Sequence, residues 1–253
     1  MPSLVNYVNL LCLVAGLPYT VSMIVYPAII GGWGHVHAVW YTWQSLNAGV
    51  LAFAASVVAL NAVKYAEEKK RQRSFVAARA FLPQALSELC NYFDKCALLN
   101  IEAWLRAKDK SDLCESPLSS ELPCMPKRYE AVFKDCISEA QPHVGEHLAY
   151  ILMRLQIHHS RMVSMCAEFS EDSDYVTVHV NIMNQVFGLA ELQCLVNQLF
   201  DYARGIGDFD GRPLEAESFF STYRVWNIDL EGHPDLVGFT ERNHAKRWNT
   251  HSK

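Results

Sequence analysis

The sequence predicts an all-α protein in which an N-terminal two-helix transmembrane hairpin is followed by a cytoplasmic helical bundle. The first observation is charge: all 22 basic and all 27 acidic residues of the 253-residue chain follow Val63. The second is periodicity, because beyond that point apolar residues recur at three- and four-residue steps, as on helices with one buried face. The mean hydropathy of +0.01 therefore averages two different environments.

Residues 40–63 form the clearest predicted span. Their 24 residues would make a helix of about 36 Å, enough to cross a hydrocarbon core of about 30 Å. Residues 4–30 form a second apolar stretch, in which Pro18 and Pro27 are tolerable because neighbouring groups in a membrane can bond the freed carbonyls. We expect a kinked spanning helix there and a glycine-rich turn at 31–37. The alternative, a signal peptide, would need a positive start and a shorter apolar core.

The basic residues of a collar at 64–80 predict the orientation of the hairpin. They outnumber the acidic residues there and are Lys64, Lys69, Lys70, Arg71, Arg73 and Arg79. The positive-inside rule places this end in the cytoplasm and the turn outside. Aromatic rings favour the interfaces, so we expect Trp40, Tyr41 and Trp43 at the outer one and Lys64 with Tyr65 at the inner one. The bilayer is the expected partner and nucleic acid is not, although such a collar can also bind anionic lipid.

Small residues recur along the second span and favour close helix packing in lipid. They are Ala48, Ala52 and Ser56, with Ala55 and Ala59 beside them. The first helix is the favoured neighbour of this row, and another copy of the chain is the alternative.

Residues 81–253 read as one α-helical domain of four or five antiparallel helices. The expected helices cover residues 66–108, 127–139, 142–169, 175–204 and 214–227, with a Ser- and Pro-rich loop at 109–126 and a polar C-terminal tail. The clearest stripe, in the helix from Pro142, comprises Val144, Leu148, Ile151, Leu155, Met162, Met165 and Phe169. The alternating residues 175–180 could instead begin with a short strand.

The motif His143-Val-Gly-Glu146-His147 fits H-x-x-E-H, a zinc-peptidase pattern. Two imidazoles one helical turn apart can share zinc, and the glutamate can accept a proton from metal-bound water. A third ligand would be needed, for which Glu215 or Glu217 is the candidate. Short motifs also arise by chance, so we expect no cofactor and keep zinc as the alternative.

His158 lies on the apolar stripe and is expected to be a buried, hydrogen-bonded core histidine. The alternative is a polar pocket for a small effector. Its candidate residues are Gln156, His158, Arg161, Asp201 and Arg204, with Glu191 from the same long helix as the last two.

Three segments of the chain resemble a group of uncharacterised bacterial inner-membrane proteins with a W-Q-x-L-x-A-G transmembrane anchor and a cytoplasmic helical region. They are Trp43-Gln-Ser-Leu-Asn-Ala-Gly49, Arg79-Ala-Phe-Leu-Pro-Gln-Ala-Leu86 and Asn197-Gln-Leu-Phe-Asp-Tyr-Ala-Arg204. The resemblance implies a location in the bacterial inner membrane and brings no activity or site residue.

Together these observations predict a membrane-anchored interaction or regulatory module rather than an enzyme. It would bind a protein partner or a second copy of itself. Two alternatives stay open, a zinc-dependent hydrolase using His143, Glu146 and His147, and a pore-forming or membrane-perturbing protein built on the hairpin.

Overall fold

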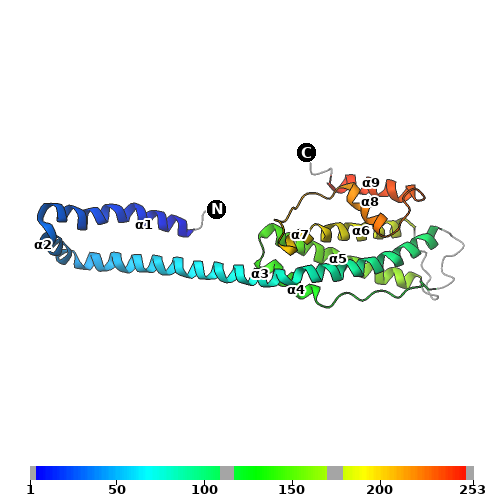
Figure 1. The fold of residues 1–253 in the computed structure, drawn as a ribbon, viewed down its shortest axis with the longest axis horizontal. Coiled ribbons are helices and arrows are strands. Elements are labelled where there is room, and N and C mark those ends of the chain that lie inside the picture. The colour runs from blue at the N-terminus through cyan, green and yellow to red at the C-terminus, as the bar shows by residue number, and fades with distance from the viewer. Residues whose placement is uncertain (1–3, 109–116, 170–178, 249–253) are drawn as a thin grey trace. The chain divides into compact units, whose positions relative to one another are not determined.

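The computed structural model describes residues 4–108, 117–169 and 179–248. These residues form helices and connecting segments and no strand, which confirms the all-α prediction. The chain divides into two compact units, Met1–Gln72 and Arg73–Lys253. Helix α3 (Gln44–Lys108) contributes its first part to one unit and its second part to the other (Figure 1).

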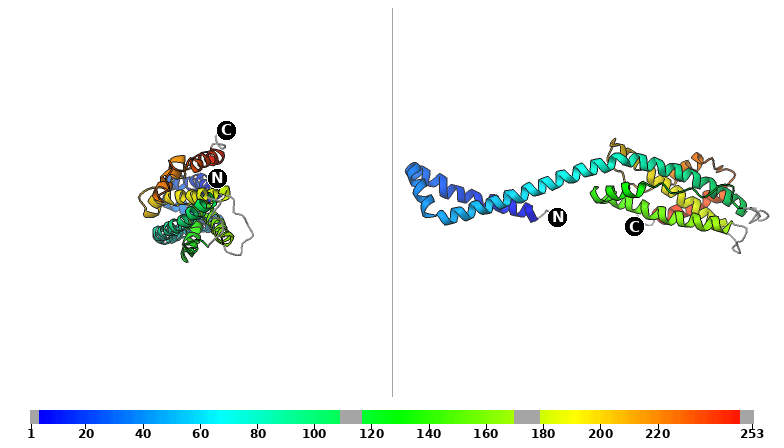
Figure 2. Two further views of the ribbon diagram at one scale, coloured as in Figure 1. Left: turned by 90° about the vertical axis from the view of Figure 1, so that its right-hand side faces the viewer. Right: turned by 90° about the horizontal axis from the view of Figure 1, so that it is seen from below.

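The first unit is a helical hairpin. Helix α1 (Leu4–Thr20) continues through a π-helical turn, η1 (Val21–Val25), into α2 (Tyr26–Thr42), and the chain then reverses into α3. Figures 1 and 2 show α1 running beside the first part of α3 in the opposite direction. Asn9 and Asn61 join the two helices by two amide hydrogen bonds of 3.0 and 2.9 Å. Nearer the bend, Tyr19 donates its hydroxyl hydrogen to Asn47 Oδ1 at 2.6 Å.

The reversal differs from the predicted turn. Residues 31–37 lie within α2, and the helix is broken there at Gly32, whose φ of 64° is favourable for glycine. The chain leaves helical geometry again at Trp43 (φ −104°, ψ 25°), so the second apolar helix begins at Gln44, within a few residues of the predicted span at about 40–63. The cluster of glycines predicted a non-helical turn. The chain instead stays helical through most of this segment and reverses at two single-residue breaks, Gly32 and Trp43.

Two helical stretches are long and apolar enough to cross a membrane, Asn9–Thr42 and one within Gln44–Lys108. In the most apolar window of each, 6% of the residues are buried. The core helix of a water-soluble protein would be mostly buried, since its apolar face must be kept from water. Here the apolar side chains point outward instead, and the most exposed of them include Leu10, Leu13, Ile29, Leu51 and Val58.

The row of small residues does not face α1. Ala48, Ala52, Ala55, Ser56 and Ala59 are all exposed. In the apolar first part of α3, residues 44–63, the less exposed positions are Asn47, Val50, Val57 and Asn61, and these follow the helical period along a different face. Packing of the row on the first helix is therefore wrong, because the paired polar residues determine which face of α3 meets α1.

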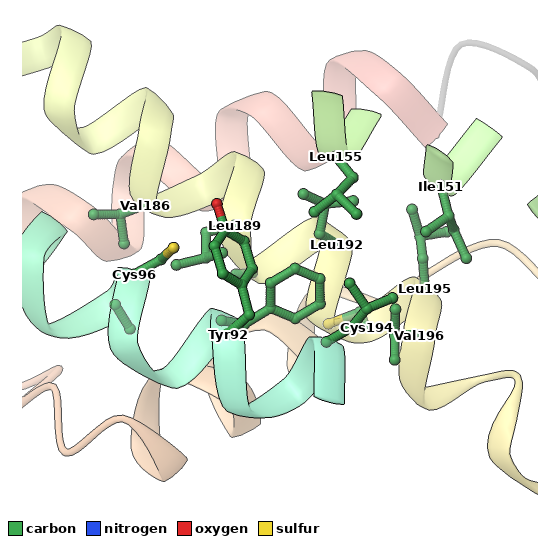
Figure 3. Close-up of a cluster of buried hydrophobic side chains, with 14 of the residues drawn as sticks. Tyr92, Cys96, Ile151, Leu155, Val186, Leu189, Leu192, Cys194, Leu195 and Val196 are labelled. Atoms are coloured by element: carbon green, nitrogen blue, oxygen red, sulfur yellow. The ribbon is translucent and has the colours of Figure 1, made fainter. Parts of the chain in front are cut away.

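The second unit is a bundle built on the end of α3. It contains α4 (Tyr129–Glu139), α5 (Pro142–Glu168), α6 (His179–Asn197), α7 (Phe200–Arg204), α8 (Ala216–Val225) and α9 (Pro234–Trp248). In Figure 1, α8 and α9 lie along one side of the bundle and α4 along another. Figure 3 shows Tyr92 and Cys96 of α3, and Ile151 and Leu155 of α5, directed toward the buried residues of α6. All seven residues of the predicted α5 stripe are buried.

Most of the predicted helices of this unit are confirmed to within a few residues. Residues 117–126 are non-helical as expected, and Gly205 ends α7 with a φ of 72°. The predicted loop residues 109–116 and the proposed strand at 175–178 lie outside the described residues, while His179 and Val180 are helical.

The prediction of a polar C-terminal tail is wrong, because residues 234–248 form α9. Leu236 and Thr240 are buried there, and Thr240 shares a 3.0 Å hydrogen bond with the hydroxyl of Tyr223 in α8. His244 donates to the Leu214 carbonyl at 2.7 Å. Pro234 and Asp235 at its start and Lys246 and Arg247 at its end suit a helix dipole. Few of its residues are apolar, so hydropathy did not reveal it.

Candidate functional site

A groove of about 650 Å³ lies where α3, α6 and α8 meet, a size typical of small-molecule sites. Helix α3 contributes Cys90 and Asp94, which are one turn apart and so share a face. Helix α6 contributes Gln193 and Asn197 with the same spacing. Helix α8 and the residues before it supply Glu215 and Glu217 and the hydroxyls of Ser218, Ser221 and Thr222.

Hydrogen bonds hold two of these side chains in place. The indole N–H of Trp226, just after α8, donates to Asp94 Oδ1 at 3.1 Å. Gln193 uses its amide nitrogen twice, donating to Cys90 Sγ at 3.2 Å and to Asn197 Oδ1 at 2.8 Å. Its Oε1 is shielded from solvent and receives no hydrogen bond. An unpaired buried acceptor of this kind costs about 1–3 kcal/mol.

The charge of the groove is negative. Asp94, Glu215 and Glu217 line it, and no Lys, Arg or His is among its described lining residues. Glu217 is paired with the exposed Arg224 at 2.6 Å. Within the described part of the chain, Asp94 and Glu215 form no ion pair. Glu215 precedes α8 without capping it through its side chain, so its carboxylate is not committed to the helix end.

Two uncharged thiols, those of Cys90 and Cys194, are among the groups that line the groove. Burial raises the pKa of Cys194 to about 11, although the hydrogen bond with Thr222 opposes the shift. Burial also raises the pKa of Cys90, against the opposing effect of the Gln193 hydrogen bond. Both groups are therefore neutral thiols near pH 7. With Leu214 and Val225, they give the groove an apolar part beside its carboxylates.

The polar pocket expected around His158 does not form. His158 is buried at 5% exposure, whereas Gln156, Arg161, Asp201 and Arg204 are all exposed. This alternative is wrong because, of the three candidate residues on α5, only His158 lies on the buried face of the helix. The expected hydrogen bond of a core histidine is also incomplete, since Nε2 has no partner.

Glu191 occupies a different polar cluster. Its side chain is fully buried in α6, and it accepts hydrogen bonds from Arg154 of α5 and Arg247 of α9. Tyr150, one turn before Arg154, donates its hydroxyl hydrogen to Glu191 Oε1 at 3.0 Å. The Arg247 guanidinium also lies 5.3 Å from the ring centre of Phe187. This cluster joins α5, α6 and α9 around one buried carboxylate.

The residues of the H-x-x-E-H motif have packing roles. The His143 and His147 rings lie 6.0 and 4.6 Å from the Phe209 ring, and His147 Nε2 donates to the Leu195 carbonyl at 3.3 Å. Burial lowers the pKa of His147, so its ring is neutral at pH 7. At Gly145 a Cβ would come within 3.3 Å of the Ile137 carbonyl oxygen. Glu146 is exposed, and no three described His, Cys, Asp or Glu side chains gather as metal ligands.

The expected interface residues lie at the two ends of the apolar part of the hairpin. Trp40, Tyr41 and Trp43 flank the break before α3, and Tyr41 is 82% exposed. Lys64 and Tyr65 follow the apolar part of α3, where the ammonium of Lys69 lies 5.6 Å from the Tyr65 ring centre. Arg79, predicted in the collar, instead lies over the Phe75 and Tyr202 rings of the second unit.

No protein-family model, curated protein or solved structure matches the chain. The groove itself escaped the sequence analysis because its residues come from distant segments. A signal was present, since Cys90 with Asp94 and Gln193 with Asn197 each place polar groups one turn apart on otherwise apolar helices.

Proposed function

We propose that this chain is a membrane-anchored interaction or regulatory module. The hairpin would hold the helical bundle at the cytoplasmic face of a bacterial inner membrane, where the bundle would bind its partner. The observation that carries the proposal is the inverted polarity of the hairpin. Asn9, Tyr19, Asn47 and Asn61 bond one another between the helices, while large apolar side chains point outward.

This arrangement suits lipid as the surrounding solvent. Unpaired polar groups are costly in hydrocarbon, whereas outward leucine and valine side chains are not. In water the same outward surface would form an apolar patch far larger than water-soluble proteins usually expose.

The orientation rests on charge. Lys64, Lys69, Lys70 and Arg71 are exposed on α3 directly after its apolar part, and positive charges favour the cytoplasmic side. They point to different sides of the helix, as expected of a segment within a layer of anionic headgroups. The bacterial origin of that membrane rests on the resemblance of Trp43–Gly49 and two further segments.

A matched pair of substitutions on α3 tests the anchor. Val58 is 68% exposed in the first unit and Val76 is 58% exposed in the second. We expect Val58→Arg to reduce membrane insertion, because arginine in a span costs about 2.5–3.5 kcal/mol, and Val76→Arg to leave it unchanged. Insertion is measured as the fraction of chain that resists extraction of membranes by alkaline carbonate. Equal insertion of the two variants, or release of the unmodified chain by carbonate, would contradict the proposal.

A further inference from the structure

We propose that the junction of α3, α6 and α9 is a proton-sensitive switch, in which protonation of His179 exchanges its hydrogen-bond partner from Trp104 to Asp235. The junction comprises Trp104 and Lys108 of α3, His179 at the start of α6, Asp235 in the first turn of α9 and His233 just before that helix. The inference concerns the bundle alone, so it goes beyond the proposed membrane anchor and does not depend on it.

Nε2 of His179 lies between a hydrogen-bond donor and an acceptor. The indole N–H of Trp104 donates to it at 3.1 Å, and Oδ2 of Asp235 lies 3.2 Å from the same nitrogen. An imidazole nitrogen either accepts a hydrogen bond or carries a proton and donates one. Nε2 can therefore bond Trp104 or Asp235, but not both at once.

The neutral ring leaves a buried group unpaired in either tautomer. When Nε2 accepts from Trp104, the ring proton lies on Nδ1, which is shielded from solvent and has no partner among the described residues. When the proton lies on Nε2, the fully buried Trp104 loses its acceptor. Leaving a buried polar group unpaired is costly, so neither neutral form satisfies the whole junction.

Asp235 supplies the charge that favours the protonated ring. Burial by itself raises the pKa of Asp235, but the His179 hydrogen bond and the Lys108 ammonium lower it overall. Asp235 is therefore a carboxylate throughout the range in which histidines ordinarily change charge, about pH 5 to 8. A protonated Nε2 would donate a charge-assisted hydrogen bond to this carboxylate.

In the described part of the chain, the other titratable groups of the junction are Lys108 and His233. The Lys108 ammonium lies 3.8 Å from Asp235 Oδ2 and 5.8 Å from the centre of the Trp104 ring. It opposes a second positive charge at His179 and competes for the same carboxylate. The His233 ring meets the Trp104 ring at 4.4 Å, while the His179 ring stacks on it at 5.9 Å. The Trp104 indole therefore reports directly on the protonation of its neighbours.

Protonation of His179 has opposite effects on two helix contacts. It adds a charged bond between α6 and α9 through Asp235. It also removes the acceptor of Trp104, which lies one turn before the end of α3. Acid should therefore strengthen the contact of α6 with α9 and loosen the end of α3 from α6.

The test is NMR spectroscopy of the full chain in neutral detergent, with the indole N–H signals followed from about pH 8 to about pH 5. Trp104→Phe identifies the Trp104 signal. Trp226, whose indole donates to Asp94 at 3.1 Å, is the internal control for an intact fold. We expect the Trp104 signal to move through one transition toward the position of an unbonded indole, and the Trp226 signal to stay. A Trp104 signal that does not move in this range would overturn the proposal.

Three variants identify the titrating group. His179→Gln keeps an oxygen that can accept from Trp104 but takes up no proton in this range, so the bonded signal should persist at every pH. His233→Gln should keep the transition. Asp235→Asn should move the transition to lower pH, because the imidazolium loses its charged acceptor. The same transition in His179→Gln, its loss in His233→Gln, or an unchanged midpoint in Asp235→Asn would contradict the inference.

Discussion

Asn9 and Asn61 exchange two hydrogen bonds across the apolar hairpin, each amide donating to the oxygen of the other at 3.0 and 2.9 Å. Asn61 also donates to the Val57 carbonyl of its own helix at 2.9 Å. In hydrocarbon, an amide that lost its partner would find no water to replace it. The pair therefore sets both the register and the facing sides of α1 and α3.

Replacing one member of this pair should destabilise the hairpin. We expect Asn9→Leu or Asn61→Leu to lower the free energy of unfolding in mixed micelles by about 1–2 kcal/mol. The double variant should lose less than the sum, because no unpaired amide is left behind. Ser56→Ala is the matched control, since the Ser56 hydroxyl donates to the Ala52 carbonyl of its own helix. Strictly additive losses would show that the two amides do not interact.

Glu191 should be the most sensitive charged residue of the bundle. Glu191→Gln leaves Arg154 and Arg247 without their buried counter-charge, so we expect a loss of about 3–5 kcal/mol in the free energy of unfolding. Urea denaturation of the full chain in detergent measures it, with the exposed Glu241→Gln as control. A loss no larger than that of the control would contradict the role of this cluster.

Removing Arg247 should release α9 without unfolding the rest. Arg247 is partly exposed, unlike Glu191, and Arg154 with Tyr150 still satisfies the carboxylate. We expect Arg247→Met to speed amide hydrogen exchange over residues 234–248 and to leave α5 and α6 protected. Uniform protection across all helices would show that Arg247 does not hold α9.

His158 should make the bundle sensitive to acid. Burial, and then the charges of His159, Arg154 and Arg161, lower the pKa of His158 to about 3. An unfolded histidine has a pKa of about 6.5, so between these values the unfolded state binds a proton that the folded state does not. The contribution of His158 to the free energy of unfolding should therefore not change with pH above about pH 6.5. Between about pH 6.5 and about pH 3, the free energy of unfolding should fall by about 1.4 kcal/mol for each unit of decreasing pH.

Denaturant unfolding at several pH values checks this slope. His158→Leu should flatten the slope and also remove the unpaired Nε2, while the exposed His143→Gln should keep the slope. Identical slopes in the unmodified chain and the His158→Leu variant would contradict the burial of a neutral imidazole.

Local pattern was enough to predict much of the bundle. The residues from Val144 to Phe169 repeat with the helical period, Pro142 begins α5 and Gly205 ends α7, so element type and boundaries follow from short-range rules. The uncharged first 63 residues likewise predict apolar helices without knowledge of any contact.

Tertiary features could not be predicted in this way. An alanine side chain can face either lipid or a neighbouring helix. The row at Ala48 and Ala52 therefore did not predict which side of the helix would contact α1. Glu191 was expected near His158, but its partner Arg154 lies one turn earlier on α5. The groove brings Cys90 and Gln193 together across 103 positions, and no periodic pattern encodes such a pairing.

The central claim is that an apolar hairpin holds the bundle on the cytoplasmic side of a membrane, and Cys124 tests it directly. Cys124 is exposed in the second unit, whereas Cys96, Cys136 and Cys194 are buried. In a Cys114→Ser background, which removes a thiol outside the described residues, we predict that a membrane-impermeant maleimide labels Cys124 in inverted inner-membrane vesicles. Intact spheroplasts should not be labelled. Labelling of Cys124 in intact spheroplasts, or recovery of the chain in the water-soluble fraction, would contradict the account.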